Sequence, residues 1–306
     1  MKVFVAGATG VLGRATIPRL IAAGHEVRGS ARSPEKADQL RAQGAEPVTV
    51  DLFDPASVRS AVDGCQGVVH MATNIPALTK AWKGSAWETN DRLRREGTQV
   101  LADACRDAGV EVLVKETVCF FYEDGGDQWI DEGWPIAREP FSEASLDAED
   151  ITLAFSGDGR RGVVLRFGLF YSHDARSLEE SLKTAKLGMG PMVGPAEGWR
   201  ASIHVDDAAA AVVAALDAPA GAYNVADEPI TNGDWNAAFA AAFGFKKLRA
   251  TPKAAMKVGG RKLSVLGASR RIDSTRFKEA TGWSPQHPDA RLGLEAVAEA
   301  HRATPI

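Results

Sequence analysis

Short apolar runs alternate with amphipathic segments through the first half of the chain. The runs KVFVA, HEVRGS, PVTV, GVVHMA, VEVLVKE and GVVLRF are typical of strands that are buried on both faces of a parallel sheet. The segments between them carry helix punctuation, because Ser33 with Pro34 and Asp54 with Pro55 open two of them and a glycine follows each. This alternation predicts a doubly wound α/β fold of the Rossmann type with right-handed crossovers.

The alternation loosens after Phe170. Residues 171–200 mix a helix with a stretch rich in glycine and proline, and residues 226–306 are mostly helical. We therefore expect a dinucleotide-binding Rossmann domain over residues 1–170, to which strands at 201–204 and 222–225 add. Residues 171–200 and 226–306 are expected to form a smaller substrate-binding lobe.

The composition is that of an ordinary globular protein. Of the 306 residues, 45% are hydrophobic and 25% are charged, and the net charge is −4. No basic face is evident, so we expect neither a nucleic acid nor an anionic membrane as partner. Cys65, Cys105 and Cys119 are too few and too scattered for a disulfide framework or a zinc site, and we expect no metal. With a first strand that begins at Lys2 and no apolar run of membrane-spanning length, a cytoplasmic protein is expected.

A glycine-rich turn directly follows the first expected strand. Gly7, Gly10 and Gly13 form a GxxGxxG pattern at the start of a helical segment. The first glycine allows a tight turn, the second allows backbone to approach a pyrophosphate, and the third allows close helix–strand packing. The helix N-terminus then faces the anion. We predict a dinucleotide site here that includes Thr9, Val11 and Leu12; the alternative is a glycine-rich turn without a ligand.

The end of the second expected strand selects between nicotinamide cofactors. An acid there would bind a free ribose 2′-hydroxyl, whereas an arginine suits the 2′-phosphate of NADP. The chain reads HEVRGSARSP, with no acid after Glu26 and with Arg32 and Ser33 at the strand end. NADP is therefore preferred and NAD is second; the alternative is that Arg32 is a solvated surface residue. Asp51 and Leu52, after the third strand, are expected to flank the adenine.

Six motifs occur in a characteristic order: GATGVLG, DLFDPASV, VVHMAT, LRFGLFYS, IHVDDAA and TGWSP. Together they resemble the extended short-chain dehydrogenase/reductase family of the NAD-dependent epimerase/dehydratase type, from the first strand to about residue 290. The resemblance implies a small-molecule substrate bound between the lobes and is compatible with a homodimer. It also implies that Ala72 and Thr73 line the nicotinamide side and that Phe167, Gly168 and Leu169 lie near the carboxamide.

The chain departs from this family at the catalytic signature, a Tyr-x-x-x-Lys pair on one helix face. In the family the lysine lowers the pKa of the tyrosine, which moves a proton as hydride is transferred. Relatives carry the pair in PYxxSKxxAE, and the corresponding stretch here is PFSEASLDAE. Phe141 and Ser145 occupy the two positions, so the usual acid–base pair is absent.

Three residues near the end of the fifth expected strand are the remaining catalytic candidates. Glu116 is a carboxylate at the sheet edge where ligands bind; otherwise it pairs with a nearby cation. Thr117 lies one residue before the catalytic Ser/Thr position of the family, and its alternative is a β-branched residue of a strand. Tyr122 is a candidate proton donor or a pocket wall, and Cys119 is expected to be an apolar filler.

Aromatic residues in polar or glycine-rich loops predict the substrate wall. These are Trp82, Trp87, Phe121, Trp129 and Trp199, and they favour a ring-bearing or apolar substrate. Arg200 is a candidate partner for an anionic group of the substrate. Arg166 and His204 are expected to be structural, with no second histidine or acid at metal-ligand spacing near His204.

Two classes of function are compatible with these features. The first is an NADP-dependent oxidoreductase, or a redox-neutral isomerase, cyclase or lyase on the same fold, that works without the Tyr–Lys pair. The second is a non-catalytic NADP-binding sensor or scaffold. The aromatic residues favour the enzyme, since a sensor needs no room for a substrate.

Overall fold

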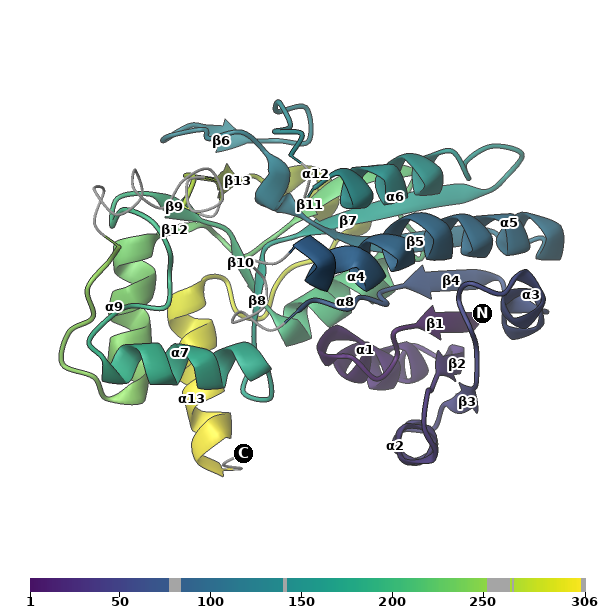
Figure 1. The fold of residues 1–306 in the computed structure, drawn as a ribbon, viewed down its shortest axis with the longest axis horizontal. Helices are drawn as coiled ribbons and strands as arrows, with labels where there is room; N and C mark the ends of the chain where they lie inside the picture. The colour runs from purple at the N-terminus through teal and green to yellow at the C-terminus, as the bar shows by residue number, and fades with distance from the viewer. Residues whose placement is uncertain (77–83, 140–141, 252–264, 266, 304–306) are drawn as a thin grey trace. The chain divides into compact units, whose positions relative to one another are not determined.

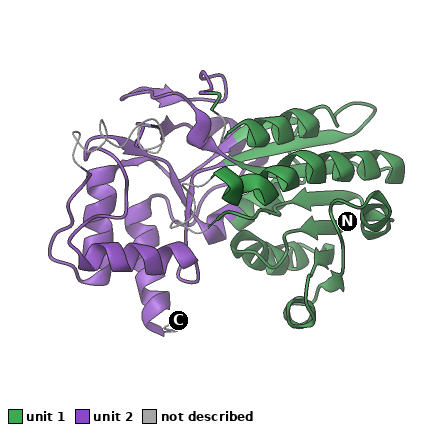
Figure 2. Cartoon of the chain, viewed as in Figure 1, with its two compact units in different colours: residues 1–117, 138–166, 209–223 green, residues 118–137, 167–208, 224–306 purple. Residues whose placement is uncertain are grey.

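The computed structural model describes residues 1–76, 84–139, 142–251, 265 and 267–303, which form two compact units. Unit 1 comprises residues 1–117, 138–166 and 209–223, and unit 2 comprises residues 118–137, 167–208 and 224–306 (Figure 2). Each unit has a buried hydrophobic core of its own.

A seven-stranded sheet is the centre of unit 1 (Figure 1). Its strands lie in the order β11-β7-β5-β4-β1-β2-β3, and the pairs β1–β2, β2–β3, β1–β4 and β4–β5 are parallel. The strands are β1 (Lys2–Ala6), β2 (Glu26–Ser30), β3 (Glu46–Val48), β4 (Gly67–His70), β5 (Val112–Val118), β7 (Arg161–Phe167) and β11 (Gly221–Val225). The order reverses between β3 and β4, which confirms the predicted doubly wound Rossmann-type fold.

Helices α2 and α3 begin where the sequence predicts. The Ser33 hydroxyl accepts a hydrogen bond from the amide of Lys36 at the start of α2, and the Asp54 carboxylate accepts one from the amide of Ala56 at the start of α3. Pro18 lies inside α1 without ending it. The helices are α1 (Val11–Ala22), α2 (Pro34–Ala42), α3 (Pro55–Val62), α4 (Glu88–Arg92), α5 (Thr98–Ala108), α6 (Glu143–Leu153) and α8 (Val205–Ala215), with a 3-10 turn η1 (Gly84–Trp87) and a π-helical turn η2 (Leu93–Gly97).

The core of unit 1 explains the apolar strand sequences. Strands β1, β4 and β5 are almost entirely buried, and α3, α5 and α6 lie side by side along the sheet (Figure 1). Phe4, Val68 and Leu113 from three strands pack with Leu101 and Cys105 of α5. Burial on both faces leaves these strands no solvated face, so their sequences show continuous apolar runs.

Unit 2 combines short strand pairs with four helices among its described residues (Figures 1 and 2). The pairs are β8 (Leu169–Tyr171) with β10 (Ser202–His204), β9 (Trp199–Arg200) with β12 (Ile230–Thr231), and β6 (Trp129–Ile130) with β13 (Arg271–Ile272). The helices are α7 (Arg176–Lys186), α9 (Asn232–Phe243), α12 (Thr275–Thr281) and α13 (Ala290–Ala303), and a 3-10 turn η3 spans Cys119–Phe121. Trp235 and Phe239 of α9 pack with Leu294 and Val297 of α13 in one core cluster.

The expected division of the chain differs from the observed one, for example in the placement of the strand at 201–204 and of residues 118–137 and 167–170. The strand expected at 201–204 does not join the large sheet, because β10 pairs in parallel with β8. Residues 118–137 belong to unit 2, although the sequence pattern assigns them to the Rossmann domain. The strand at 222–225 does join the large sheet as part of β11. Among the described residues, no helix is long and apolar enough to span a membrane.

Candidate functional site

The turn between β1 and α1 is a tight glycine loop. Gly7 has a φ of +88°, and its amide donates a hydrogen bond of 2.9 Å to the hydroxyl of Ser30 at the end of β2. The amide of Gly10 donates to the carbonyl of Gly7 at 3.0 Å. A β-carbon on Gly7 would lie 2.6 Å from the backbone of Met71 and Ala72. Two features therefore exclude a side chain at this position: the backbone conformation of Gly7 and the close approach of the segment after β4.

The third glycine brings α1 against this loop. A β-carbon on Gly13 would lie 2.2 Å from the carbonyl oxygen of Gly7 and 2.6 Å from that of Ala8. Gly10 is the N-cap residue of α1, and no side chain at this position bonds the amides of the first turn. The first turn also contains no acid. A helix N-terminus of this kind, lined by backbone and free of negative charge, fits the pyrophosphate of a dinucleotide.

The end of β2 presents a positive charge. Arg32 is exposed and makes no hydrogen bond or ion pair with any described residue, and Ser33 beside it caps α2. Asp51 is exposed after β3 and accepts a bond from the amide of Phe53, whereas Leu52 is packed into the core of unit 1. These residues leave Arg32 available for a phosphate.

The remaining cofactor candidates follow β4 and β7. Ala72 and Thr73 are half-buried directly after β4, in unit 1 with the glycine turn. Phe167, Gly168 and Leu169 belong to unit 2, where the amide of Gly168 donates to the carbonyl of Val225 at 3.0 Å. The role of these five residues in cofactor binding stays a prediction.

Glu116 lies in a group of buried charges near the carboxyl end of β5. One carboxylate oxygen is 3.9 Å from Nη2 of Arg94, and the other is 3.9 Å from Nζ of Lys115. All three side chains are at least nine-tenths buried. Burial lowers the pKa of Lys115 to about 7, Glu116 raises it, and Arg94 lowers it further. Glu116 thus has two cations nearby, which agrees with the alternative that it pairs with a cation. Neither cation is within hydrogen-bond distance of its carboxylate.

Thr117 and Tyr122 are both committed to buried hydrogen bonds. The hydroxyl of Thr117 donates to Glu149 at 2.7 Å, and Glu149 forms a buried ion pair of 2.6 Å with Arg166. The hydroxyl of Tyr122 donates to the side-chain oxygen of Asn224 at 2.8 Å. Both side chains are fully buried. This geometry favours the structural alternative for Thr117 and supports the expected structural role of Arg166.

The two positions that the sequence comparison assigns to the catalytic pair are described in part. Phe141 lies outside the described residues. Ser145 is a buried residue of α6, and its amide donates to the carbonyl of Ser142 at 3.0 Å. A serine hydroxyl carries no positive charge, so at this position the chain offers no counterpart of the family lysine.

The described residues of the predicted aromatic wall belong to both units. Trp82 lies outside the described residues, Trp87 is a half-buried residue of unit 1, and Phe121 is buried in unit 2. The guanidinium carbon of Arg271 lies over the rings of both Trp129 and Trp199, 4.1 and 4.3 Å from their centroids. These two tryptophans therefore have a cation as a partner within unit 2.

Arg200 is held by hydrogen bonds within unit 2. Its Nε donates to Asn232 at 3.1 Å, and another nitrogen donates to the carbonyl of Val193. Burial lowers the pKa of Arg200 to about 10, with a contribution from the positive charge of Arg270. A guanidinium that is buried and bonded in this way joins loops of unit 2, and the assignment of Arg200 to a substrate anion stays a prediction.

Three residues in unit 2, His204 among them, lie close together. His204, Asp207 and His287 bring possible metal ligands within 4.8 Å of one another, although Asp207 and His287 are 80 positions apart. The Asp207 carboxylate already accepts bonds from the amides of Gln286 and His287 and from Nδ1 of His287. Since both of its oxygens are bonded, this geometry favours a clamp on the loop before α13 over a metal site.

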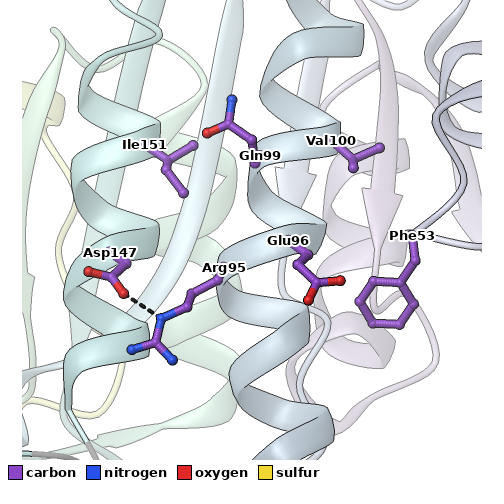
Figure 3. Close-up of a pocket in the computed structure, with 7 residues that line it drawn as sticks. All are labelled: Phe53, Arg95, Glu96, Gln99, Val100, Asp147 and Ile151. Atoms are coloured by element: carbon purple, nitrogen blue, oxygen red, sulfur yellow. Dashed lines mark hydrogen bonds and ion pairs between the residues drawn. The ribbon is translucent and has the colours of Figure 1, made fainter.

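A shallow groove of about 550 Å³ lies on unit 1, between α5, α6 and the loop before α3 (Figure 3). Arg95 and Asp147 pair across it, and Phe53 lies at its side in Figure 3. Its lining comprises Phe53, Arg95, Glu96, Gln99, Val100, Asp147 and Ile151. None of the predicted substrate residues is among them, so the groove carries no substrate assignment.

Sequence reasoning missed Arg94, Lys115 and His70. Arg94 belongs to the charged run DRLRREG, which resembles a solvated helix face, yet it is 4% exposed. The one signal visible in the sequence was Lys115, which lies inside the apolar strand VEVLVKE. A lysine is rarely buried unless its ammonium is paired.

Comparisons with known proteins agree with this geometry. The family model described as the NAD dependent epimerase/dehydratase family matches residues 3–226. The 3-diazoavenalumate denitrifying reductase of a Streptomyces species is 32% identical over 96% of this chain and 99% of its own. The human epimerase family protein SDR39U1 is 26% identical over 97% of this chain and 99% of its own. A crystal structure of that human protein, solved with NADPH, has a TM-score of 0.82 over 98% of this chain and 99% of its own.

Proposed function

Because the chain belongs to the NAD-dependent epimerase/dehydratase family, we propose that it is an NADPH-dependent reductase of an electron-poor, ring-bearing small molecule. The observation that carries the cofactor choice is Arg32, an exposed guanidinium without a partner among the described residues at the end of β2. The turn at Gly7, Gly10 and Gly13 would hold the pyrophosphate. NADPH binding by the human relative supports the same choice.

The missing Tyr–Lys pair supports the choice of acceptor. The cofactor supplies a hydride, and reduction of an ordinary ketone needs a proton donor at the carbonyl oxygen. Phe141 and Ser145 offer neither an acidic phenol nor a cation. A conjugated alkene, an iminium or a diazo compound is more electrophilic and takes hydride without that donor. The similarity to a reductase named for a diazo substrate supports this class.

Glu116 is the acid–base group that we propose for the proton that follows the hydride. It lies near the carboxyl end of β5, the edge at which an α/β sheet binds its ligands. One of its oxygens has no hydrogen-bond partner among the described residues, whereas the hydroxyls of Thr117 and Tyr122 are both bonded. Glu116 is therefore preferred over the other two candidates.

An assay of NADPH oxidation tests the reductase. The acceptors are panels of ketones, enones, imines and aryl diazo compounds, and enones, imines or diazo compounds are expected to be reduced faster than ketones. Heat-treated protein is the control for direct reduction by NADPH. If no panel member is reduced while a sugar nucleotide is epimerised without net loss of NADPH, the protein is a redox-neutral enzyme. If neither reaction occurs and NADPH still binds tightly, the sensor is the better explanation.

Arg32→Ala is expected to weaken NADPH binding by about 10- to 100-fold, because a charge-assisted hydrogen bond to the 2′-phosphate contributes about 1.5–3 kcal/mol. NADH affinity should stay nearly constant, since NADH has no 2′-phosphate. Titration calorimetry measures both constants. Arg41→Ala is the matched control, because Arg41 lies on α2 and pairs with Asp38. Tighter binding of NADH than of NADPH by the unaltered protein would contradict the choice of cofactor.

A further inference from the structure

Unit 1 buries two cations and a carboxylate without joining them by hydrogen bonds. Arg94, Lys115 and Glu116 are 4%, 0% and 5% exposed. Both cation–carboxylate distances are 3.9 Å, which is beyond hydrogen-bond length. Nη1 of Arg94 and Oε2 of Glu116 have no partner among the described residues. Because buried polar atoms are nearly always bonded, these two atoms indicate a polar molecule between the three side chains.

A single water molecule meets this requirement. A water at this place would donate to Oε2 of Glu116 and accept from Nη1 of Arg94 and from the ammonium of Lys115, and buried waters commonly have about three such partners. The ammonium also donates to the carbonyls of Glu116 at 2.8 Å and His70 at 3.3 Å. These two bonds fix Nζ beside the carboxylate and leave a third N–H for the water.

The same three side chains are connected to the predicted cofactor segment after β4. Nδ1 of His70 accepts a bond from the amide of Ala72 at 3.4 Å, and its Nε2 lies 3.3 Å from the carbonyl of Leu93, which precedes Arg94. Arg94 itself lies on the π-helical turn η2, a kind of turn that occurs often at functional sites. Lys115 is also the register partner of His70 in the sheet.

We propose that Lys115, Glu116 and Arg94 form a proton relay that takes the place of the absent Tyr–Lys pair. This proposal rests on the proposed function. Hydride addition to a neutral acceptor leaves an anion, and Glu116 passes a proton to it. The N–H bond of the Lys115 ammonium breaks and its proton moves through the bridging water to Glu116, which leaves a neutral amine. Solvent then returns a proton to the amine, while Arg94 keeps the carboxylate in position.

The pKa of Lys115 suits this role. Burial lowers it to about 7, near the pH at which a group both gives and regains a proton readily. The charges that face the ammonium are Glu116 and Glu149, which raise its pKa, and Arg94, which lowers it. His70 stays neutral, because burial and the charge of Lys115 hold its pKa well below its ordinary value. The relay thus has one group that titrates near neutral pH.

Two substitutions should move this titration in opposite directions. Removal of a positive charge by Arg94→Met should raise the pKa of Lys115, and removal of a negative charge by Glu116→Gln should lower it, each by about 1 unit. Lysine NMR with ¹³C-labelled side chains follows the titration in the protein without any cofactor or substrate. The signal should vanish in Lys115→Met, and Arg59→Met should leave its midpoint unchanged, because Arg59 is in an exposed pair with Asp107.

The rate of NADPH oxidation should follow the same midpoint. An acid must be protonated to act, so the rate of the unaltered protein is expected to be highest below the pKa of Lys115 and to fall as pH rises through it. Arg94→Met should move this fall to higher pH. Lys115→Arg retains the charge but cannot release a proton near neutral pH, so its kcat should drop by about 100-fold, as in Lys115→Met.

The outcomes separate the relay from the reductase. If Lys115→Arg keeps the kcat and the pH profile of the unaltered protein, Lys115 contributes charge alone and the relay is wrong. A ¹³C titration that stays fixed in both Arg94→Met and Glu116→Gln would also overturn it. If the ¹³C midpoints move as expected but no acceptor is reduced, the reductase proposal fails while the coupled charges are supported.

Discussion

Gly13→Ala is expected to weaken NADPH binding by about 100-fold or more and to lower the melting temperature. The added β-carbon would lie 2.2 Å from the carbonyl oxygen of Gly7 and 2.6 Å from that of Ala8. Both neighbours are backbone atoms, so α1 must move away from β1 and the turn must open. The amides of the turn then no longer converge on the pyrophosphate.

Titration calorimetry with NADPH measures the first effect and thermal unfolding the second. Gly84→Ala is the matched control, because apart from its chain neighbours no atom of the described residues lies within 4 Å of its added β-carbon. That variant should keep both the affinity and the melting temperature. Native affinity in Gly13→Ala would show that α1 is not packed against the turn as the structure describes.

Arg166→Met is expected to lower the free energy of unfolding by about 3–5 kcal/mol. The substitution leaves Glu149, a buried carboxylate, with the hydroxyl of Thr117 but without its cation. An uncompensated buried charge is among the most destabilising changes in a protein. The double variant Arg166→Met/Glu149→Met should recover much of the loss, because two apolar side chains of similar volume replace the pair.

Urea unfolding followed by circular dichroism measures these differences. The exposed pair of Arg59 with Asp107 is the control, and Asp107→Ala should change the free energy of unfolding by less than about 1 kcal/mol. If Arg166→Met retains the stability of the unaltered protein and loses activity instead, Arg166 belongs to the reaction and its structural assignment is wrong.

Local sequence signals predicted the fold well because they act between near neighbours. The Ser33 and Asp54 caps bond amides two or three residues away, and residue type alone decides whether such a bond forms. The glycine turn is similar, since Gly7 requires a positive φ that any other residue would resist. The apolar strands follow from burial on both faces of the sheet. The Rossmann-type order could therefore be predicted before the structure.

The aromatic residues show that local sequence signals do not predict the partners of a side chain. Trp199 lies in a glycine-rich segment, which suggested a free ring available to a substrate. In the structure it stacks on Arg271, a residue 72 positions later that also contacts Trp129. Arg200 likewise bonds Asn232 and Val193. A side chain's partner depends on which distant segment packs beside it, and sequence spacing does not contain that information.

The sequence by itself thus predicted the doubly wound fold and the glycine turn, because each depends on the local backbone, and the choice of Arg32 for a phosphate stays a prediction. The tertiary structure alone decided that Lys115, Glu116 and Arg94 share one buried site and that His204, Asp207 and His287 meet. The physical reason is electrostatic: the pKa and the hydrogen bonding of a charged group depend on its burial and on charges brought to within a few ångströms by folding.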